Sequence, residues 1–146
     1  MKKTILIIVY ASFAIFFVNC SAKGQKFTTF QKPTKDKSML YIYRPNSMVG
    51  YMVSYDIKDA NNDHQTLGTL KNNGYIFKEV EPGQKALYGL HKQFKTNISI
   101  KKNQIICLKS FIQQTQVING LTGITPIIPV DINICKQEIQ NTRGNK

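Results

Sequence analysis

The sequence predicts an all-β fold, a small antiparallel β-sandwich of about seven or eight strands. Residues 39–139 are rich in Ile, Val, Thr, Tyr and Phe, the residue types that favour strands. Clusters of Gly, Pro, Asn and Asp interrupt this stretch at intervals of about 8 to 15 residues, as in sandwiches and barrels. No window carries a sustained apolar stripe of helical period.

Length and charge exclude several classes of protein. A chain of 146 residues forms one domain, and it is too short for a (β/α)₈ barrel or a doubly wound nucleotide-binding fold. The formal charge of +12 would suit a nucleic-acid partner. However, Lys2, Lys3 and a run of lysines within residues 20–38 hold much of that charge outside the predicted β domain. We therefore expect no nucleic-acid partner.

The first nineteen residues read as an export signal. Lys2 and Lys3 precede an almost uninterrupted apolar run over residues 5–18. This run has the length of a signal-peptide core and is short for a spanning helix of about 20 residues. We predict a signal peptide of lipoprotein type over residues 1–19.

Cys20 is the predicted lipidation site and the first residue of the mature chain. Phe17-Val18-Asn19-Cys20 resembles a bacterial lipobox, with Phe17 and Asn19 departing from the usual pattern. Cleavage after Ala22 by an ordinary signal peptidase, and retention as an uncleaved anchor, stay open as alternatives. All three place the body of the protein outside the cytoplasm, and a lipidated Cys20 would hold it on a membrane.

Three further segments follow the signal. Residues 20–38 are basic and show no strand or helix period, so we expect a flexible tether. Residues 39–139 are the predicted β-sandwich domain, and residues 140–146 a polar, frayed tail. The strands expected within the domain cover residues 39–44, 51–58, 65–70, 75–81, 85–90, 94–101, 104–113 and 130–139.

Two local signals refine this strand pattern. Asn73-Gly74 lies between two predicted strands and is typical of a β-hairpin turn, because both residues tolerate positive φ. Gly68 lies inside a predicted strand, which indicates a bulge or a close approach of another chain segment.

A series of short motifs gives the chain a family likeness. In order, they are Leu40-Tyr41-Ile42-Tyr43-Arg44-Pro45, Gly50, Tyr55-Asp56-Ile57, Leu67-Gly68-Thr69-Leu70, Asn73-Gly74-Tyr75 and Glu81-Pro82-Gly83. This series resembles the DUF2846 family of small bacterial envelope proteins, and its Gly-x-Leu and Pro-Gly order is similar to PEGA-type β modules. The resemblance implies an all-β sandwich in the cell envelope and supplies no activity.

Cys107 and Cys135 are a candidate disulfide pair. Both lie in predicted strands of an exported domain, and antiparallel pairing about the loop at residues 119–123 would place them opposite each other. Such a bond would stabilise the fold by about 3 kcal/mol. Two buried free thiols, and a redox or metal role, are the alternatives.

Residues 117–130 form an uncharged stretch with two glycines and two prolines. One interpretation is a loop folded over an open end of the sandwich. The other is an apolar contact surface for a partner or a membrane, formed by Leu121, Ile124, Ile127 and Ile128.

The remaining reactive residues match no catalytic or metal-binding motif. His64 and His91 have no metal-ligand spacing, and Asp59 and Asp63 fall short of a calcium loop. Glu79 and Glu81 fit a solvated strand face. We therefore expect no catalytic residues, no metal and no cofactor.

These observations together predict a non-enzymatic lipoprotein of the cell envelope that acts as a binding or structural module. Its partners would be the membrane, through the lipid anchor, and an envelope protein or anionic polymer. It would face the periplasm from the outer or inner membrane. The alternatives are a secreted or periplasmic module that binds anionic envelope components and, less favoured, an enzyme acting on envelope polymers.

Overall fold

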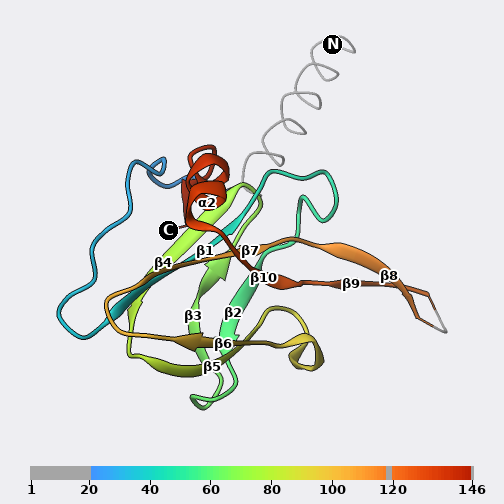
Figure 1. The fold of residues 1–146 in the computed structure, drawn as a ribbon. Helices are drawn as coiled ribbons and strands as arrows, with labels where there is room; N and C mark the ends of the chain where they lie inside the picture. Colours follow the sequence, from blue (N-terminus) through green and yellow to red (C-terminus); the bar gives the residue numbers. More distant parts are fainter. Residues whose placement is uncertain (1–20, 118–119, 146) are drawn as a thin grey trace, which may run out of the picture.

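The predicted all-β fold is confirmed. The computed structural model describes residues 21–117 and 120–145, which form two packed β-sheets, a projecting hairpin and a short helix (Figure 1). The predicted signal peptide over residues 1–19 and the lipidation site Cys20 lie outside the described residues. Among those described, no helix has the length and apolar character needed to cross a membrane.

The first sheet has five strands in the order β10-β7-β1-β4-β11. Their bounds are β1 Ser38–Arg44, β4 Gly74–Val80, β7 Ile105–Ser110, β10 Ile127–Val130 and β11 Arg143–Gly144. The sheet is mixed: β1 runs parallel to β7, and β11 runs parallel to β4. The expectation of a purely antiparallel sandwich is therefore wrong for this sheet.

The second sheet is antiparallel, with the order β3-β2-β5-β6. Its strands are β2 Tyr55–Asp59, β3 Gln65–Leu70, β5 Gly83–Tyr88 and β6 Thr96–Ile100, and the short 3₁₀ helix η2 covers Lys92–Phe94. The β2–β3 register shifts opposite Gly68, where a Cβ would also crowd Ile76. This confirms the bulge and the close approach expected at Gly68.

The Asn73-Gly74 turn has a different role from the one predicted. Asn73 has the expected positive φ of 53°, but β3 and β4 belong to different sheets. The turn therefore carries the chain from one sheet to the other and closes no hairpin.

The stretch expected to be a loop, residues 117–130, contains strands. β8 Gln113–Val117 and β9 Gly120–Ile124 form a two-stranded hairpin, and β10 follows it. Figure 1 shows this hairpin extending away from the two sheets. The strands were missed because the glycines and prolines of this stretch lower strand propensity. These residues do not forbid a strand at the edge of a sheet.

The main core lies between the two sheets. Leu40 and Ile42 of β1 and Leu108 of β7 pack against Ile57 of β2 and Leu87 of β5. Every residue of β1 is buried, because its outer face is covered as well. Successive side chains point to opposite faces, so Met39, Tyr41 and Tyr43 meet a second cluster.

The helix α2, Ile132–Ile139, covers part of this outer face. The sequence predicts a strand over residues 130–139, and that prediction is wrong. Asp131 caps the helix by accepting a hydrogen bond from the Asn133 amide at 2.8 Å. Cys135 and Ile139, four residues apart, share the buried side of the helix.

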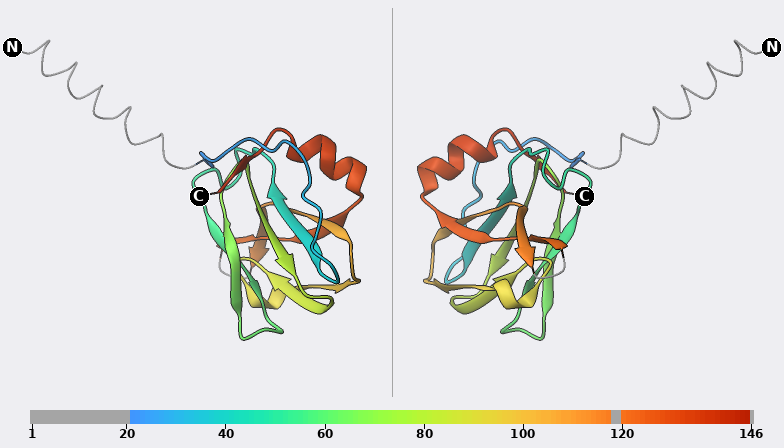
Figure 2. Two further views of the ribbon diagram at one scale, coloured as in Figure 1. Left: turned by 90° about the vertical axis from the view of Figure 1, so that its left-hand side faces the viewer. Right: turned by 90° about the vertical axis from the view of Figure 1, so that its right-hand side faces the viewer.

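The N-terminal segment and the C-terminal tail cover the rest of the outer face, side by side (Figure 2). The amide of Gly24 donates to the Gly144 carbonyl, the Gly144 amide donates to Gln25, and the Phe27 amide donates to Thr142. Phe27 and Thr142 are buried. Residues 21–31 are therefore packed where a flexible tether was expected, and residues 140–145 are paired where a frayed tail was expected.

Candidate functional site

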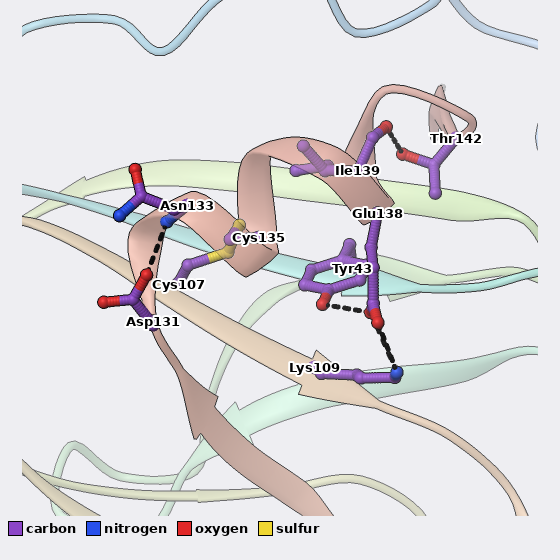
Figure 3. The surroundings of a disulfide bond; sticks show 9 residues. All are labelled: Tyr43, Cys107, Lys109, Asp131, Asn133, Cys135, Glu138, Ile139 and Thr142. Atoms are coloured by element: carbon purple, nitrogen blue, oxygen red, sulfur yellow. Dashed lines mark hydrogen bonds and ion pairs between the residues drawn. A yellow bond between two sulfur atoms is a disulfide. The ribbon is translucent and has the colours of Figure 1, made fainter.

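Cys107 and Cys135 are joined by a disulfide beneath helix α2 (Figure 3). Their Cα atoms lie 6.2 Å apart, and both residues are buried. The expected geometry is corrected in one respect. Cys107 lies on β7, but Cys135 lies on α2, so the bond joins a helix to the sheet and does not join two strands.

A charged contact beside the disulfide fixes the other end of α2. The Tyr43 hydroxyl donates to Glu138 Oε2 at 2.6 Å, and Lys109 Nζ lies 2.8 Å from the same carboxylate (Figure 3). The hydrogen bonds from Lys109 and Tyr43 hold the pKa of Glu138 below its usual value. Burial, reinforced by Glu138, raises the pKa of Tyr43. Both carboxylate oxygens are engaged, so this group serves to hold the helix.

The residues of the predicted apolar contact surface differ in exposure. Ile127 is 1% exposed and belongs to the main core, whereas its neighbour Ile128 is 42% exposed. Ile124 is half-buried, and the side chain of Leu121 lies outside the described part of the chain. The four residues do not form one surface, because alternation along β10 turns Ile127 inward.

The two histidines and Asp59 have structural partners. His64 Nδ1 lies 2.9 Å from the Tyr88 hydroxyl, and His91 packs edge-to-face against Phe94. Asp59 is buried and pairs with Lys85 at 3.2 Å. Within residues 21–117 and 120–145, no group of His, Cys, Asp and Glu side chains could hold a metal ion.

The acidic strand end formed by Glu79 and Glu81 holds the N-terminal segment. The Thr34 amide donates to Glu79 Oε1 at 2.7 Å and holds the pKa of that carboxyl below its usual value. Lys37 lies 3.9 Å from Glu79 and 3.3 Å from Glu81. These contacts fasten the segment to the end of β4 just before β1 begins.

An aromatic cluster on the outer face is the clearest candidate for ligand contact. Phe77 of β4 stacks on Tyr41 of β1 with 5.5 Å between ring centroids and on Tyr75 at 6.3 Å. Phe27 closes one side of the cluster, with its ring 6.1 Å from Tyr41 and 5.7 Å from Tyr75. Phe77 itself is 43% exposed, so part of its ring reaches solvent above a buried aromatic neighbour, Tyr41.

Two hollows flank Phe77 and Tyr75, one on each side. A hollow of about 120 Å³ adds Gln25, Lys26 and Gln31 from the N-terminal segment. A larger hollow of about 330 Å³ adds Leu67 and Thr69 of β3 and Asn145 of the tail. We name Phe77, Tyr75, Tyr41 and these two hollows the aromatic platform.

The aromatic platform could not be found from sequence. Tyr41, Tyr75 and Phe77 share an outward strand face, but the sequence does not show that Phe27 and the tail come to rest beside them. The signal available was the alternation of aromatic residues at Tyr75 and Phe77, which fits a core face equally well.

Comparisons with protein-family models, with curated proteins and with solved structures give no match. The resemblance to the DUF2846 family and to PEGA-type modules therefore stays a prediction from the motifs.

Proposed function

We propose that this protein is an exported, membrane-tethered, non-enzymatic binding module of the bacterial cell envelope. The observation that carries the proposal is the N-terminal sequence: a basic start, an apolar run over residues 5–18, and Cys20. The packed domain begins at residue 21, so a lipid on Cys20 would hold the domain directly at the membrane surface.

The disulfide supports export. A bond between Cys107 and Cys135 persists in the oxidising space outside the cytoplasm, where thiols are not kept reduced. It also secures helix α2, which is too short at eight residues to be stable without tertiary contacts.

The aromatic platform is the proposed ligand-contact surface, and its chemistry suits a glycan segment. The C–H faces of sugar rings pack on flat aromatic rings such as Phe77. Amide and ammonium groups such as those of Gln25, Lys26 and Gln31 hydrogen-bond to hydroxyl groups and fix orientation. Glycan polymers are abundant in bacterial envelopes, which matches the proposed location.

Fractionation of cells tests the tether. Cys20→Ala should block lipid attachment, so the protein should lose metabolic labelling with a radioactive fatty acid and should no longer be processed after residue 19. Ser21→Ala, next to it in the chain, is the matched control and should be labelled as the wild type is. Equal labelling of the wild type and Cys20→Ala would overturn lipidation.

Co-sedimentation with purified cell-wall sacculi tests the platform. Phe77→Ala should reduce the sedimented fraction about tenfold, the size of effect expected when a central aromatic contact is lost. Phe94→Ala is the control, because Phe94 is 38% exposed and lies in η2, away from the platform. If the sedimented fraction falls as the salt concentration rises and is the same for the wild type and Phe77→Ala, the alternative is favoured, a binder of anionic envelope components.

A further inference from the structure

The β1–β2 connection presents an exposed apolar cluster. Met48 is 90% exposed and Met52 is 68% exposed, and Val49 and Val53 beside them also face solvent. We name these four residues the apolar tip. Residues 45–55 contain no charged side chain. Soluble surfaces seldom carry such clusters unless a partner or a membrane covers them.

The apolar tip is held in shape by a buried cation. Arg44 donates from Nη1 to the Val53 carbonyl at 2.6 Å and from Nη2 to the Gly50 carbonyl at 2.7 Å. Its guanidinium also lies 5.5 Å from the Tyr55 ring centre. Burying a cation is costly unless it is well bonded, so these contacts define one loop geometry.

Two turns and a glycine complete the loop. The Tyr51 amide donates to Met48, and the Val53 amide donates to Gly50 at 2.9 Å. Gly50 has a φ of 67°, and a Cβ there would overlap Ile112. An ordered loop therefore presents the apolar side chains, and this lowers the entropic cost of binding through them.

The apolar tip lies beside the point where the described chain begins. Ser21 Oγ donates to the Tyr51 hydroxyl oxygen at 3.3 Å, and Ser21 also pairs with Asn72. Asn72 in turn donates to Asn46 at 2.8 Å and accepts from the Ser47 amide at 3.1 Å. Asn72 thus ties residue 21 to the base of the loop. Both views of Figure 2 place the β1–β2 loop next to the first described residues.

We propose that the apolar tip rests in the lipid bilayer beside the anchor and orients the domain on the membrane. This inference rests on the proposed tether. One residue spans at most about 3.6 Å, so a lipid on Cys20 would bring the bilayer surface within reach of Tyr51 and its neighbours. Tyrosine favours the interface between lipid and water, and methionine and valine favour the hydrocarbon below it.

The charge pattern fits an anionic lipid surface. The first acidic residue of the chain is Asp36, and none occurs from Lys37 to Tyr55. The segment leaving the membrane and the loop beside it would therefore not repel acidic headgroups. A lipid anchor and an apolar insertion are two separate membrane signals, and two signals give stable attachment.

Tryptophan substitution offers a direct test, because the chain has no tryptophan. Full-length Met52→Trp and Phe94→Trp proteins would be purified from the membranes of producing cells and placed in vesicles containing brominated phosphatidylcholine and phosphatidylglycerol. Phe94 is the control because η2 lies at the opposite end of the domain from the loop (Figure 1). Bromine quenches tryptophan only at short range, so quenching reports insertion. Flotation of the vesicles reports the tether separately.

The expected result is flotation of both variants, with Met52→Trp emission reduced to about half at the shallow depth typical of interfacial insertion and Phe94→Trp emission unchanged. Flotation without quenching of Met52→Trp would overturn the docking and leave the tether standing. Failure to float would overturn both. The tryptophan of Met52→Trp could instead become less exposed to water as the protein concentration in detergent rises, with no bromine quenching in vesicles. That result would assign the apolar tip to contact with a second copy of the chain and would overturn its insertion in the bilayer.

Discussion

The two faces of the five-stranded sheet are closed by different kinds of cover. The inner face meets the second sheet through aliphatic side chains such as Leu40, Ile42 and Leu108. The outer face meets three separate segments: the N-terminal residues 21–31, helix α2 and the tail. Aromatic rings, a disulfide and polar contacts hold that second cover in place.

This difference bears on how the domain unfolds and on where the two proposed binding surfaces lie. Sheet-on-sheet packing is continuous, so each inner residue is held by many neighbours and unfolds only with the whole domain. The outer segments are held by the disulfide, by hydrogen bonds and by the aromatic cluster. The aromatic platform and the apolar tip both adjoin these segments, so the two proposed binding surfaces lie where the cover is made of separate segments.

Adjacent residues of β10 test the division most strongly. Ile127→Ala should lower the free energy of unfolding by about 4 kcal/mol, because it leaves a cavity in the main core. Ile128→Ala, one residue along the same strand and 42% exposed, should change it by under about 0.5 kcal/mol. Urea unfolding followed by circular dichroism measures both. Equal effects would contradict the assignment of Ile127 to the inner face.

The disulfide is the strongest single link on the outer face. Replacing both cysteines, Cys107→Ala with Cys135→Ala, should lower the free energy of unfolding by about 3 kcal/mol through the larger entropy of the unfolded chain. Adding a reductant to the wild type should reproduce most of that loss and should leave the double variant unchanged. If the reductant has no effect on the wild type and alkylation finds two free thiols, the bond is absent.

Phe27 tests whether the N-terminal segment is part of the fold. Phe27→Ala should lower the free energy of unfolding by roughly 3 kcal/mol, the low end for a buried phenylalanine, because an exposed segment carries it. It should also expose Lys26 and Lys32 to trypsin. Thr28→Ala, on an exposed neighbour, is the control. Rapid cleavage of this segment in the wild type would restore the flexible tether predicted from its composition.

The inner face was largely predictable and the outer face was not. The strands at residues 39–44 and 65–70 were predicted from local composition and the turn residues that end them. The structure has β1 at Ser38–Arg44 and β3 at Gln65–Leu70. The packing of residues 21–31 depends on Asn72, Thr142 and Gly144, which are distant in sequence. The composition of this segment shows that it is polar and basic, which does not predict that it packs on the sheet.

The strand predicted over residues 130–139, where the structure has helix α2, was wrong for a different reason. Ile132, Ile134 and Ile139 are β-branched and favour a strand, and an eight-residue helix shows barely two turns of its period. Tertiary contacts through Cys135 and Ile139 decide the outcome, and they are not visible in the local sequence. The sequence named Cys107 and Cys135 as a candidate disulfide pair beside two alternatives. That argument placed Cys135 on a strand, so the structure has the pair in a different local setting from the one expected.

Glu138 should make a small, pH-dependent contribution on the outer face. Its pKa in the folded protein is lowered by Lys109 and Tyr43, so the folded state favours the ionised carboxylate. The stabilisation is therefore present above the unfolded pKa of about 4.3 and is lost as the pH falls through the lower folded pKa. Because the pair is partly solvated, we expect under about 1 kcal/mol.

Unfolding titrations of the wild type and Glu138→Gln at a series of pH values measure this contribution. The difference in the free energy of unfolding should be largest near neutral pH and should vanish in acid, where the wild-type carboxyl is protonated too. Tyr43→Phe removes one of the two hydrogen bonds and should give a smaller pH dependence than the wild type. A difference between the wild type and Glu138→Gln that persists unchanged into acid would mean that Glu138 holds α2 through packing, and that the outer cover owes nothing to its charge.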